Sequence, residues 1–412
     1  MFRELDTVLR LVFVVLALCA ASVASAQERA DAVGAVAPDV KQWITQLASP
    51  VQAERESATK ALIAAGPRVM PEIYDALESK DAEVRIRAEF VAQALEAQAA
   101  KYLSLKLRVP PQVFPGVHSA RFVERKLGVE EMQHLACLYR LETLVIQGSE
   151  INDNLFQYVG QVRNLKSLVL DSRDARGKAT GSIDITDEAL EHLRSLNRLT
   201  DFNVSGTRIR GKGFAALAEL PSLQSIGIAR CHALDESLIE GLEPFRGHKG
   251  LLSLTIAFCR VPKGVGEPIS HIAYLQRLSL EGTTITDEEL KPLSALPNLQ
   301  RLYLGFTQIS DAGVMYVTKC PQLQDLYLQD TQITNTGVRY LLKSPQLRDV
   351  DLSWTNVTPA DLTVLSGLKT LRTVVVSGVC ANEEQWLAVK KALPGVGVGW
   401  DPERPTAPRY PR

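Results

Sequence analysis

The feature that most constrains this chain is a short leucine pattern, Leu-x-x-Leu-x-Leu, that returns at nearly regular intervals. With conservative replacements it begins at ten positions: Leu141, Leu165, Leu199, Leu223, Leu251, Leu275, Leu299, Leu323, Leu347 and Leu371. The successive intervals are 24, 34, 24, 28, 24, 24, 24, 24 and 24 residues. Such a period predicts a stack of similar units, because one unit cannot bury its apolar face alone.

Each unit changes its apolar spacing once along its length. In the unit that starts at Leu299, apolar residues first alternate and then continue at helical spacing. This change predicts a strand, a turn and a short helix. We expect Ile309, Val314 and Val317 to point inward, and the units to form an α/β solenoid with a parallel sheet on one face.

The start of each predicted helix has a repeated polar pattern. Thr186, Thr286 and Ser310 each follow an isoleucine and precede an aspartate. The hydroxyl can cap the helix N-terminus, and the carboxylate favours the positive end of the helix. Prolines end several helices before the next strand: Pro221, Pro297, Pro321 and Pro345.

Small polar side chains recur eight residues after the first leucine of eight units. They are Ser149, Thr207, Cys231, Cys259, Thr283, Thr307, Thr331 and Thr355. In a stack they form one column and can bond backbone groups exposed by the turn. Cys231 and Cys259 are therefore interpreted as members of this ladder, with a disulfide between them as the alternative.

From Leu141 to about Val376 the chain resembles a leucine-rich-repeat solenoid. The sequence from Leu275 to Asp287 is most similar to the cysteine-containing, ribonuclease-inhibitor-like subclass. The resemblance implies a right-handed horseshoe with a parallel sheet on the concave face, used chiefly for protein binding. Well-known members of the subclass carry an F-box, which this sequence lacks, so a ubiquitin-ligase adaptor is not expected.

The first residues are typical of an export signal. Arg3 and Arg10 precede an apolar run, and Ala24-Ser25-Ala26 forms a cleavage site. Residues 1–26 are predicted to be a signal peptide, since the run is shorter than the ~20 residues of a membrane span. An uncleaved anchor is the alternative. An export signal does not distinguish between the periplasm, the cell envelope and the exterior as the location of the protein.

A helical region precedes the repeats. We predict a linker at 27–37, an α-helical module at 38–106 and a proline-rich connector at 107–122. The spacing of its apolar and charged residues resembles a HEAT-type repeat, which implies that Asp81 and Arg85 or Arg87 tie neighbouring helices together. An ordinary helical bundle is the alternative.

The predicted repeat domain spans 123–400, with about ten repeats between 141 and 380. A helix from about Val123 to Leu138 is expected to cap its start. A helix from Asn382 to Leu393 and a short strand at Val396–Val398 are expected to close its end. Residues 401–412 are interpreted as a loose tail.

Composition excludes several classes of function. Lys and Arg total 46 against 47 for Asp and Glu, so net charge gives no reason to expect nucleic acid or an anionic membrane as a partner. After signal cleavage the chain has an odd number of cysteines, and its histidines lack metal-ligand spacing. We therefore predict no metal, no cofactor and no disulfide framework.

The sequence favours binding over catalysis. It has no GxSxG, HExxH, Walker or GxGxxG motif. Asp325, Asp349 and Asp351 superficially resemble the carboxylates of a glycoside hydrolase, but an open concave face provides no cleft. The prediction is a monomeric, non-enzymatic protein-binding scaffold. A carbohydrate-binding envelope module and a structural spacer are the alternatives.

Aligning the strands in register predicts a partner-binding patch within residues 299 to about 361. Its candidate residues are Arg301, Tyr303, Phe306, Asp325, Tyr327, Asp330, Asp349, Asp351 and Trp354. Tyr and Trp are frequent interface anchors, and neighbouring aspartates repel unless a cation meets them. We expect a partner that presents basic and apolar groups. The alternative is a solvated wall with no dedicated partner.

Overall fold

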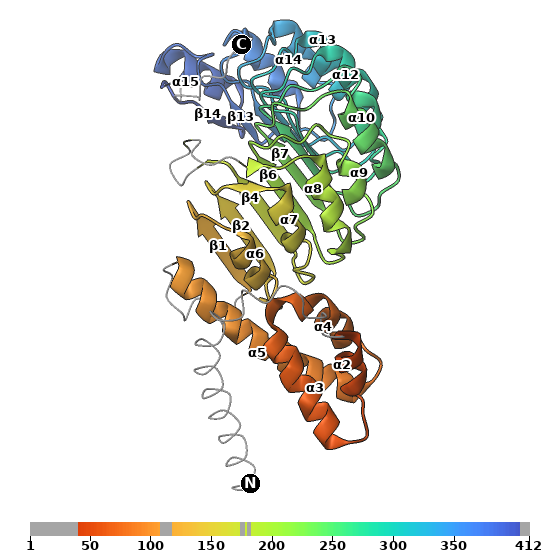
Figure 1. Cartoon of the computed structure of the whole chain (residues 1–412). Coiled ribbons are helices and arrows are strands. Elements are labelled where there is room, and N and C mark those ends of the chain that lie inside the picture. Colours follow the sequence, from red (N-terminus) through yellow and green to blue (C-terminus); the bar gives the residue numbers. More distant parts are fainter. Residues whose placement is uncertain (1–39, 108–117, 174–177, 179–182, 404–412) are drawn as a thin grey trace.

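A computed structural model describes residues 40–107, 118–173, 178 and 183–403 (Figure 1). The predicted signal peptide and linker lie outside the described residues, as do most of the predicted connector and tail. The same holds for residues 174–177 and 179–182, within the 34-residue interval that starts at Leu165.

In the described part of the chain, one parallel sheet of 12 strands follows the chain order. Its strands are β1 (Ser119–Val123), β2 (Thr143–Gln147), β4 (Ser167–Asp171), β6 (Asp201–Ser205), β7 (Ser225–Ala229), β8 (Ser253–Ala257), β9 (Arg277–Ser279), β10 (Arg301–Tyr303), β11 (Asp325–Tyr327), β12 (Asp349–Asp351), β13 (Thr373–Val375) and β14 (Gly397–Gly399). A second, two-stranded sheet pairs β3 (Ile151–Asn152) with β5 (Ile183–Asp184).

Short helices cover the outer side of this curved sheet (Figure 1). They are α6 (Val129–Leu135), α7 (Asp153–Val159), α8 (Asp187–Glu191), η3 (His192–Ser195), α9 (Phe214–Leu217), α10 (Ser237–Leu242), η4 (Glu243–Phe245), α11 (Gly266–Ser270), α12 (Asp287–Leu293), α13 (Asp311–Val317), α14 (Asn335–Leu341) and η5 (Asp361–Gly367). The predicted α/β solenoid is confirmed. Ile309, Val314 and Val317 are all buried.

The helix starts join each repeat to the next one. Ser310 caps α13, as predicted, by accepting a hydrogen bond from the backbone N–H of Ala312. The carboxylate of Asp287 accepts hydrogen bonds from the N–H and the hydroxyl of Ser310, at 2.9 and 2.5 Å. Asp311 makes the same pair of bonds to Thr334. The aspartates therefore link adjacent repeats, a role that the helix-dipole argument did not foresee.

The column of small polar side chains is confirmed as a ladder of local hydrogen bonds. Thr283 and Thr331 each donate to the carbonyl three residues before, at 2.6 Å. The thiols of Cys231 and Cys259 donate to the carbonyls two residues before, at 3.4 and 3.2 Å. Both cysteines are buried and free, so the disulfide alternative is not formed.

Before the repeats lies an all-helical region. It consists of α2 (Val40–Gln46), α3 (Gln52–Ala65), η1 (Gly66–Val69), α4 (Met70–Leu77) and α5 (Ala82–Leu107). Arg85 donates to the carbonyls of Ser79 and Lys80, in the turn before its own helix. Asp81 accepts from the first N–H groups of α5. Both therefore fix the start of α5, so the role implied by the HEAT resemblance, tying neighbouring helices, is wrong for them. The HEAT resemblance itself stays a prediction.

The helical region packs directly onto the capping helix α6 and the first repeat. The ring of Tyr102 on α5 stacks on His134 of α6, with centroids 3.9 Å apart. Tyr74 donates to the carbonyl of Ala136 at 3.5 Å, and Arg163 forms an ion pair with Asp75. One continuous hydrophobic core extends from the helices through the repeats.

The two ends of the solenoid differ in how well they were predicted. At the start, residues 119–123 form strand β1 where the connector prediction expected none, and the capping helix α6 is shorter than the predicted 123–138. At the far end, α15 (Glu383–Ala392) begins after its cap Asn382, and β14 closes the sheet. That end agrees with the prediction.

Candidate functional site

The first column of the predicted patch contains Arg301, Asp325 and Asp349, and Arg277 of β9 extends this column by one strand. The parallel register aligns all four side chains across β9 to β12. Arg301 Nε lies 2.8 Å from Asp325 Oδ2. Burial raises the pKa of Asp325 above its usual value, Arg301 opposes this shift, and the neighbouring Asp349 adds to it. The column therefore contains one ion pair flanked by a further arginine and a further carboxylate.

The second column contains a stacked pair of tyrosines. The rings of Tyr303 and Tyr327 are 4.4 Å apart between centroids and almost parallel, at 3°. Burial raises the pKa of Tyr327, and Tyr303 and Asp325 act in the same direction. Asp351 continues the column and accepts a hydrogen bond from the N–H of Ser353 at 2.8 Å. The structure therefore brings together six of the predicted residues, which we call the floor patch: Arg301, Tyr303, Asp325, Tyr327, Asp349 and Asp351.

A polar bridge beside the floor patch was missed by the sequence analysis. Gln329 donates to Glu281 at 3.3 Å, across the intervening Gly305. A Cβ at Gly305 would lie only 2.4 Å from the Gln329 side chain, so the bridge needs glycine there. Burial raises the pKa of Glu281. The only sequence signal was a glycine between two polar residues spaced two repeats apart.

The other three predicted residues, Phe306, Asp330 and Trp354, occupy a separate row at the strand exits. Their backbones are left-handed, with φ of 59°, 54° and 59°. A Cβ added to Gly378 would lie 2.0 Å from the indole of Trp354, so this ring rests against the next repeat. This row borders the floor patch and is not part of it.

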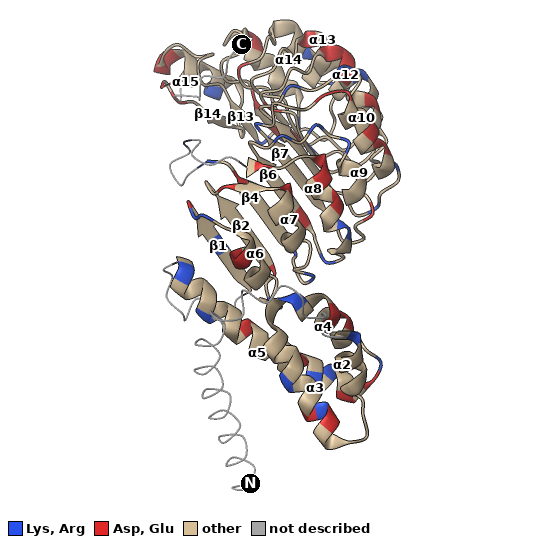
Figure 2. Cartoon of the chain, viewed as in Figure 1, with Lys and Arg blue, Asp and Glu red and all other residues tan. Residues whose placement is uncertain are grey.

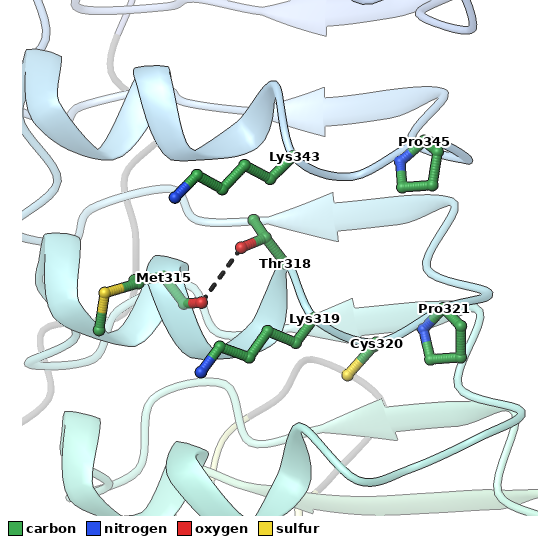
Figure 3. A pocket seen from close by; sticks show the side chains of 7 residues that line it. All are labelled: Met315, Thr318, Lys319, Cys320, Pro321, Lys343 and Pro345. Atoms are coloured by element: carbon green, nitrogen blue, oxygen red, sulfur yellow. Dashed lines mark hydrogen bonds between the residues drawn. The ribbon is translucent and has the colours of Figure 1, made fainter.

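The outer face carries a separate shallow groove of about 530 Å³. Figure 3 shows its lining, with Lys319 and Lys343 extending in parallel from successive repeats. Their ammonium groups lie 5.5 and 5.2 Å from the ring centroids of Tyr316 and Tyr340. Each lysine lies over a half-buried tyrosine ring, and the buried thiol of Cys320 donates to the backbone carbonyl of Leu293. The groove therefore has no arrangement typical of a catalytic or ligand site.

Among the described residues, neither the distribution of charge nor the metal-binding residue types indicate a second candidate site. Figure 2 shows acidic and basic residues interspersed along the solenoid. In the residues that the structure describes, no three His, Cys, Asp or Glu side chains are grouped to hold a metal ion. Across the same ranges, no helix combines the length and the apolar character of a membrane span.

Comparison with known proteins agrees with this architecture. Residues 295–317 match the family model described as leucine rich repeat. The match covers about one repeating unit of the solenoid. No curated protein matches the chain significantly. The ribonuclease-inhibitor-like subclass stays a prediction.

Several solved structures are similar to this chain at low identity. An internalin from Listeria monocytogenes has a TM-score of 0.46 at 17% identity, covering 75% of this chain and 95% of the internalin. A plant peptide hormone receptor, solved in complex with RGF2, has a TM-score of 0.31 at 15% identity, covering 61% of this chain and 53% of the receptor. A leucine-rich-repeat protein from Leptospira interrogans has a TM-score of 0.34 at 13% identity, covering 64% of this chain and 79% of that protein. At these scores the likenesses say nothing about what this chain binds.

Proposed function

We propose that this chain is an exported, non-enzymatic scaffold whose floor patch binds a protein presenting basic and apolar groups. The observation that carries the proposal is the stacked pair Tyr303 and Tyr327, edged by carboxylates on the concave sheet. The proposal of export rests on the sequence of residues 1–26.

The tyrosine pair supplies a preformed apolar anchor. Each ring is half-buried and stacked on the other. Both side chains are therefore already ordered in the free protein, and partner binding would cost little further side-chain entropy. Anchors of this kind contribute most of the affinity of many interfaces, because ordering a mobile side chain costs about 0.5–1.5 kcal/mol.

The charges of the floor patch favour a cationic partner. Three carboxylates, those of Asp325, Asp349 and Asp351, outnumber the two guanidinium groups of the same columns, those of Arg277 and Arg301. Asp325 and Asp349 are direct cross-strand neighbours, and like charges so placed repel. A lysine or arginine of the partner would relieve this repulsion.

Catalysis is not part of the proposal, because the floor patch lacks the groups that it requires. Arg301 donates a hydrogen bond to Asp325, and Asp351 accepts one from the backbone N–H of Ser353. No nucleophile and base converge on a common point among these residues.

A pull-down from envelope extract tests the proposal, with residues 27–412 as bait. The variant Tyr303→Ala with Tyr327→Ala removes the anchor. The control Tyr316→Ala with Tyr340→Ala removes two rings from the outer helices α13 and α14. We expect wild type and control to retain the same prominent protein, and the floor variant to lose it.

The other outcomes assign the function differently. Equal recovery by all three baits would place binding elsewhere. A ligand that survives trypsin treatment of the extract would favour the carbohydrate-binding alternative. Recovery of nothing by any bait would favour the structural spacer.

A further inference from the structure

Exposed apolar side chains are concentrated on one helix of the helical region. In the part of the chain that the structure describes, eight large apolar side chains are exposed. Three of them lie on α5: Ile86 at 65%, Phe90 at 43% and Leu105 at 73%. The other five are on separate segments: Val51, Val129, Tyr274, Leu342 and Leu387. Single exposed apolar residues are ordinary on a protein surface, whereas several on one helix indicate an interaction face.

The three exposed residues lie on one side of α5, which runs from the helical region toward the first strand of the sheet (Figure 1). α5 packs against α3, α4 and α6, and Val91 and Leu95 are among its buried residues. Six other residues fall within an arc of about 100° on this helix. We call them the α5 strip: Ile86, Phe90, Ala94, Ala97, Lys101 and Leu105. Five of the six are exposed, and Ala94 is half-buried.

The α5 strip has the same spacing when it is read from either end. Its successive intervals are 4, 4, 3, 4 and 4 residues. A twofold dimer needs such symmetry, because its two copies present the same surface and every contact occurs twice. Two antiparallel α5 helices, with the twofold axis between positions 95 and 96, would place three kinds of pairs across the interface. Ile86 would face Leu105 of the second copy, Phe90 would face Lys101, and Ala94 would face Ala97.

The residues paired in this way are complementary in size and chemistry. Ile86 and Leu105 are both large and apolar, so they would form contacts at the two ends. Ala94 and Ala97 are small, and the distance between packed helices depends on the side chains at their contact. Lys101 would lie over the ring of Phe90, where an ammonium group is attracted to the aromatic face. The protein contains such a contact within one copy, since Lys390 Nζ lies 5.0 Å from the ring centroid of Trp386.

The size of the α5 strip predicts how tightly two copies bind. Rows of residues spaced by four interdigitate when two helices cross at about 50°. The strip is ~29 Å long and a helix is ~10 Å wide, which gives a footprint of roughly 290 Å². Standard interfaces bury ~800 Å² on each partner, so an interface of this size is weak. The net charge of −1 adds little long-range repulsion between copies.

We propose that the α5 strip binds the α5 strip of a second copy of this chain in an antiparallel pair. The protein then forms a weak, reversible dimer in place of the predicted monomer. This interface lies on the helical region, and none of its residues belongs to the floor patch.

Sedimentation velocity of residues 27–412, from about 1 to about 200 µM, tests the proposal. We expect the average sedimentation coefficient of wild type to rise with concentration. The variant Phe90→Arg would place an arginine opposite Lys101 at two sites of the dimer, so its Kd should rise at least about tenfold. The control Leu387→Arg makes the same kind of change at an exposed position of α15 and should dimerise as wild type does.

The double variant Phe90→Arg with Lys101→Glu tests the antiparallel register. Positions 90 and 101 are ~16 Å apart along one helix, so the new charges can pair only between two copies. We expect the Kd of this variant to return to within about threefold of wild type. Continued loss of dimerisation in the double variant would overturn the antiparallel register. Unchanged dimerisation by Phe90→Arg would show that the copies meet elsewhere. A wild-type chain that stays monomeric at about 200 µM would also overturn the proposal, and would leave this face of α5 to a protein of another sequence.

Discussion

Single residues in this solenoid are constrained by the close approach of neighbouring repeats. Gly378 shows the constraint most directly, with φ of +71° and the indole of Trp354 across its Cα. Gly395 has a similar φ of +84°, but no atom lies within 4 Å of the place where its Cβ would be. The two glycines therefore separate the cost of the backbone conformation from the cost of the ring contact.

We expect Gly378→Ala to destabilise the protein more than Gly395→Ala. The second change costs only about 1–2 kcal/mol of backbone strain, whereas the first must also displace the Trp354 ring. Urea unfolding of the two variants measures the difference. Adding Trp354→Gly to Gly378→Ala should restore the part of the unfolding free energy that is lost through the ring contact. Equal decreases in unfolding free energy for Gly378→Ala and Gly395→Ala would contradict that contact.

The threonine ladder allows a second test at this scale. Thr331 donates to the carbonyl of Leu328 inside the protein at 2.6 Å. Thr331→Val keeps the shape of the side chain but leaves that carbonyl without the hydroxyl, which costs about 1–3 kcal/mol. Thr336→Val, at an exposed position of α14, is the control and should change the free energy of unfolding much less. A similar effect of both variants would mean that the hydroxyl of Thr331 is not needed.

Most of the floor patch could be predicted because the parallel register of the strands fixes which side chains lie next to each other across the sheet. Once the leucines set the repeat, Tyr303 had to lie beside Tyr327, and Asp325 beside Asp349. The bridge from Glu281 to Gln329 could not be predicted in this way, since it skips a repeat and depends on side-chain rotamers.

At the scale of elements, the first strand was missed because its apolar pattern is weak. Counting back 24 residues from Leu141 gives Val117, and Ala120 and Phe122 then stand at the other two leucine positions. Alanine at one of these positions and prolines nearby concealed the strand. The register of β1 with β2 shows that the pattern continues one repeat further than the leucines do.

Helix-to-helix links should contribute measurably to stability. Asp311 at the start of α13 accepts two hydrogen bonds from Thr334, at 2.8 and 2.5 Å. Hydrogen bonds to charged groups contribute about 1.5–3 kcal/mol, so Asp311→Ala should lower the free energy of unfolding by a comparable amount. Glu288→Ala, in the exposed first turn of α12, is the matched control. If chemical denaturation gave the same value for both, the carboxylate of Asp311 would not link the repeats.

At the scale of the whole molecule, the helical region and the repeats share one core, and a charged group lies where they meet. Glu96 of α5 is 4% exposed, and its Oε2 is 3.9 Å from the Nε of Arg140, directly before the first repeat. Its other oxygen has no hydrogen-bond partner among the described residues. Burial raises the pKa of Glu96 above its usual value, and Arg140 only partly opposes the shift.

This raised pKa predicts that Glu96 makes folding depend on pH. Since the folded protein holds the Glu96 proton more tightly than the unfolded chain, stability from this group is present at low pH and is lost as pH rises through the folded pKa. Glu96→Gln should therefore be more stable than wild type near neutral pH, and its advantage should shrink as the buffer is acidified from about pH 8 to about pH 4. Urea unfolding of both proteins across this range measures the difference. Glu89→Gln, at an exposed position of the same helix, is the matched control for the loss of a carboxylate. A constant difference between Glu96→Gln and wild type would mean that the carboxyl does not titrate differently in the folded state. A difference that follows pH would show that ionisation of Glu96 weakens the joint between the helices and the repeats.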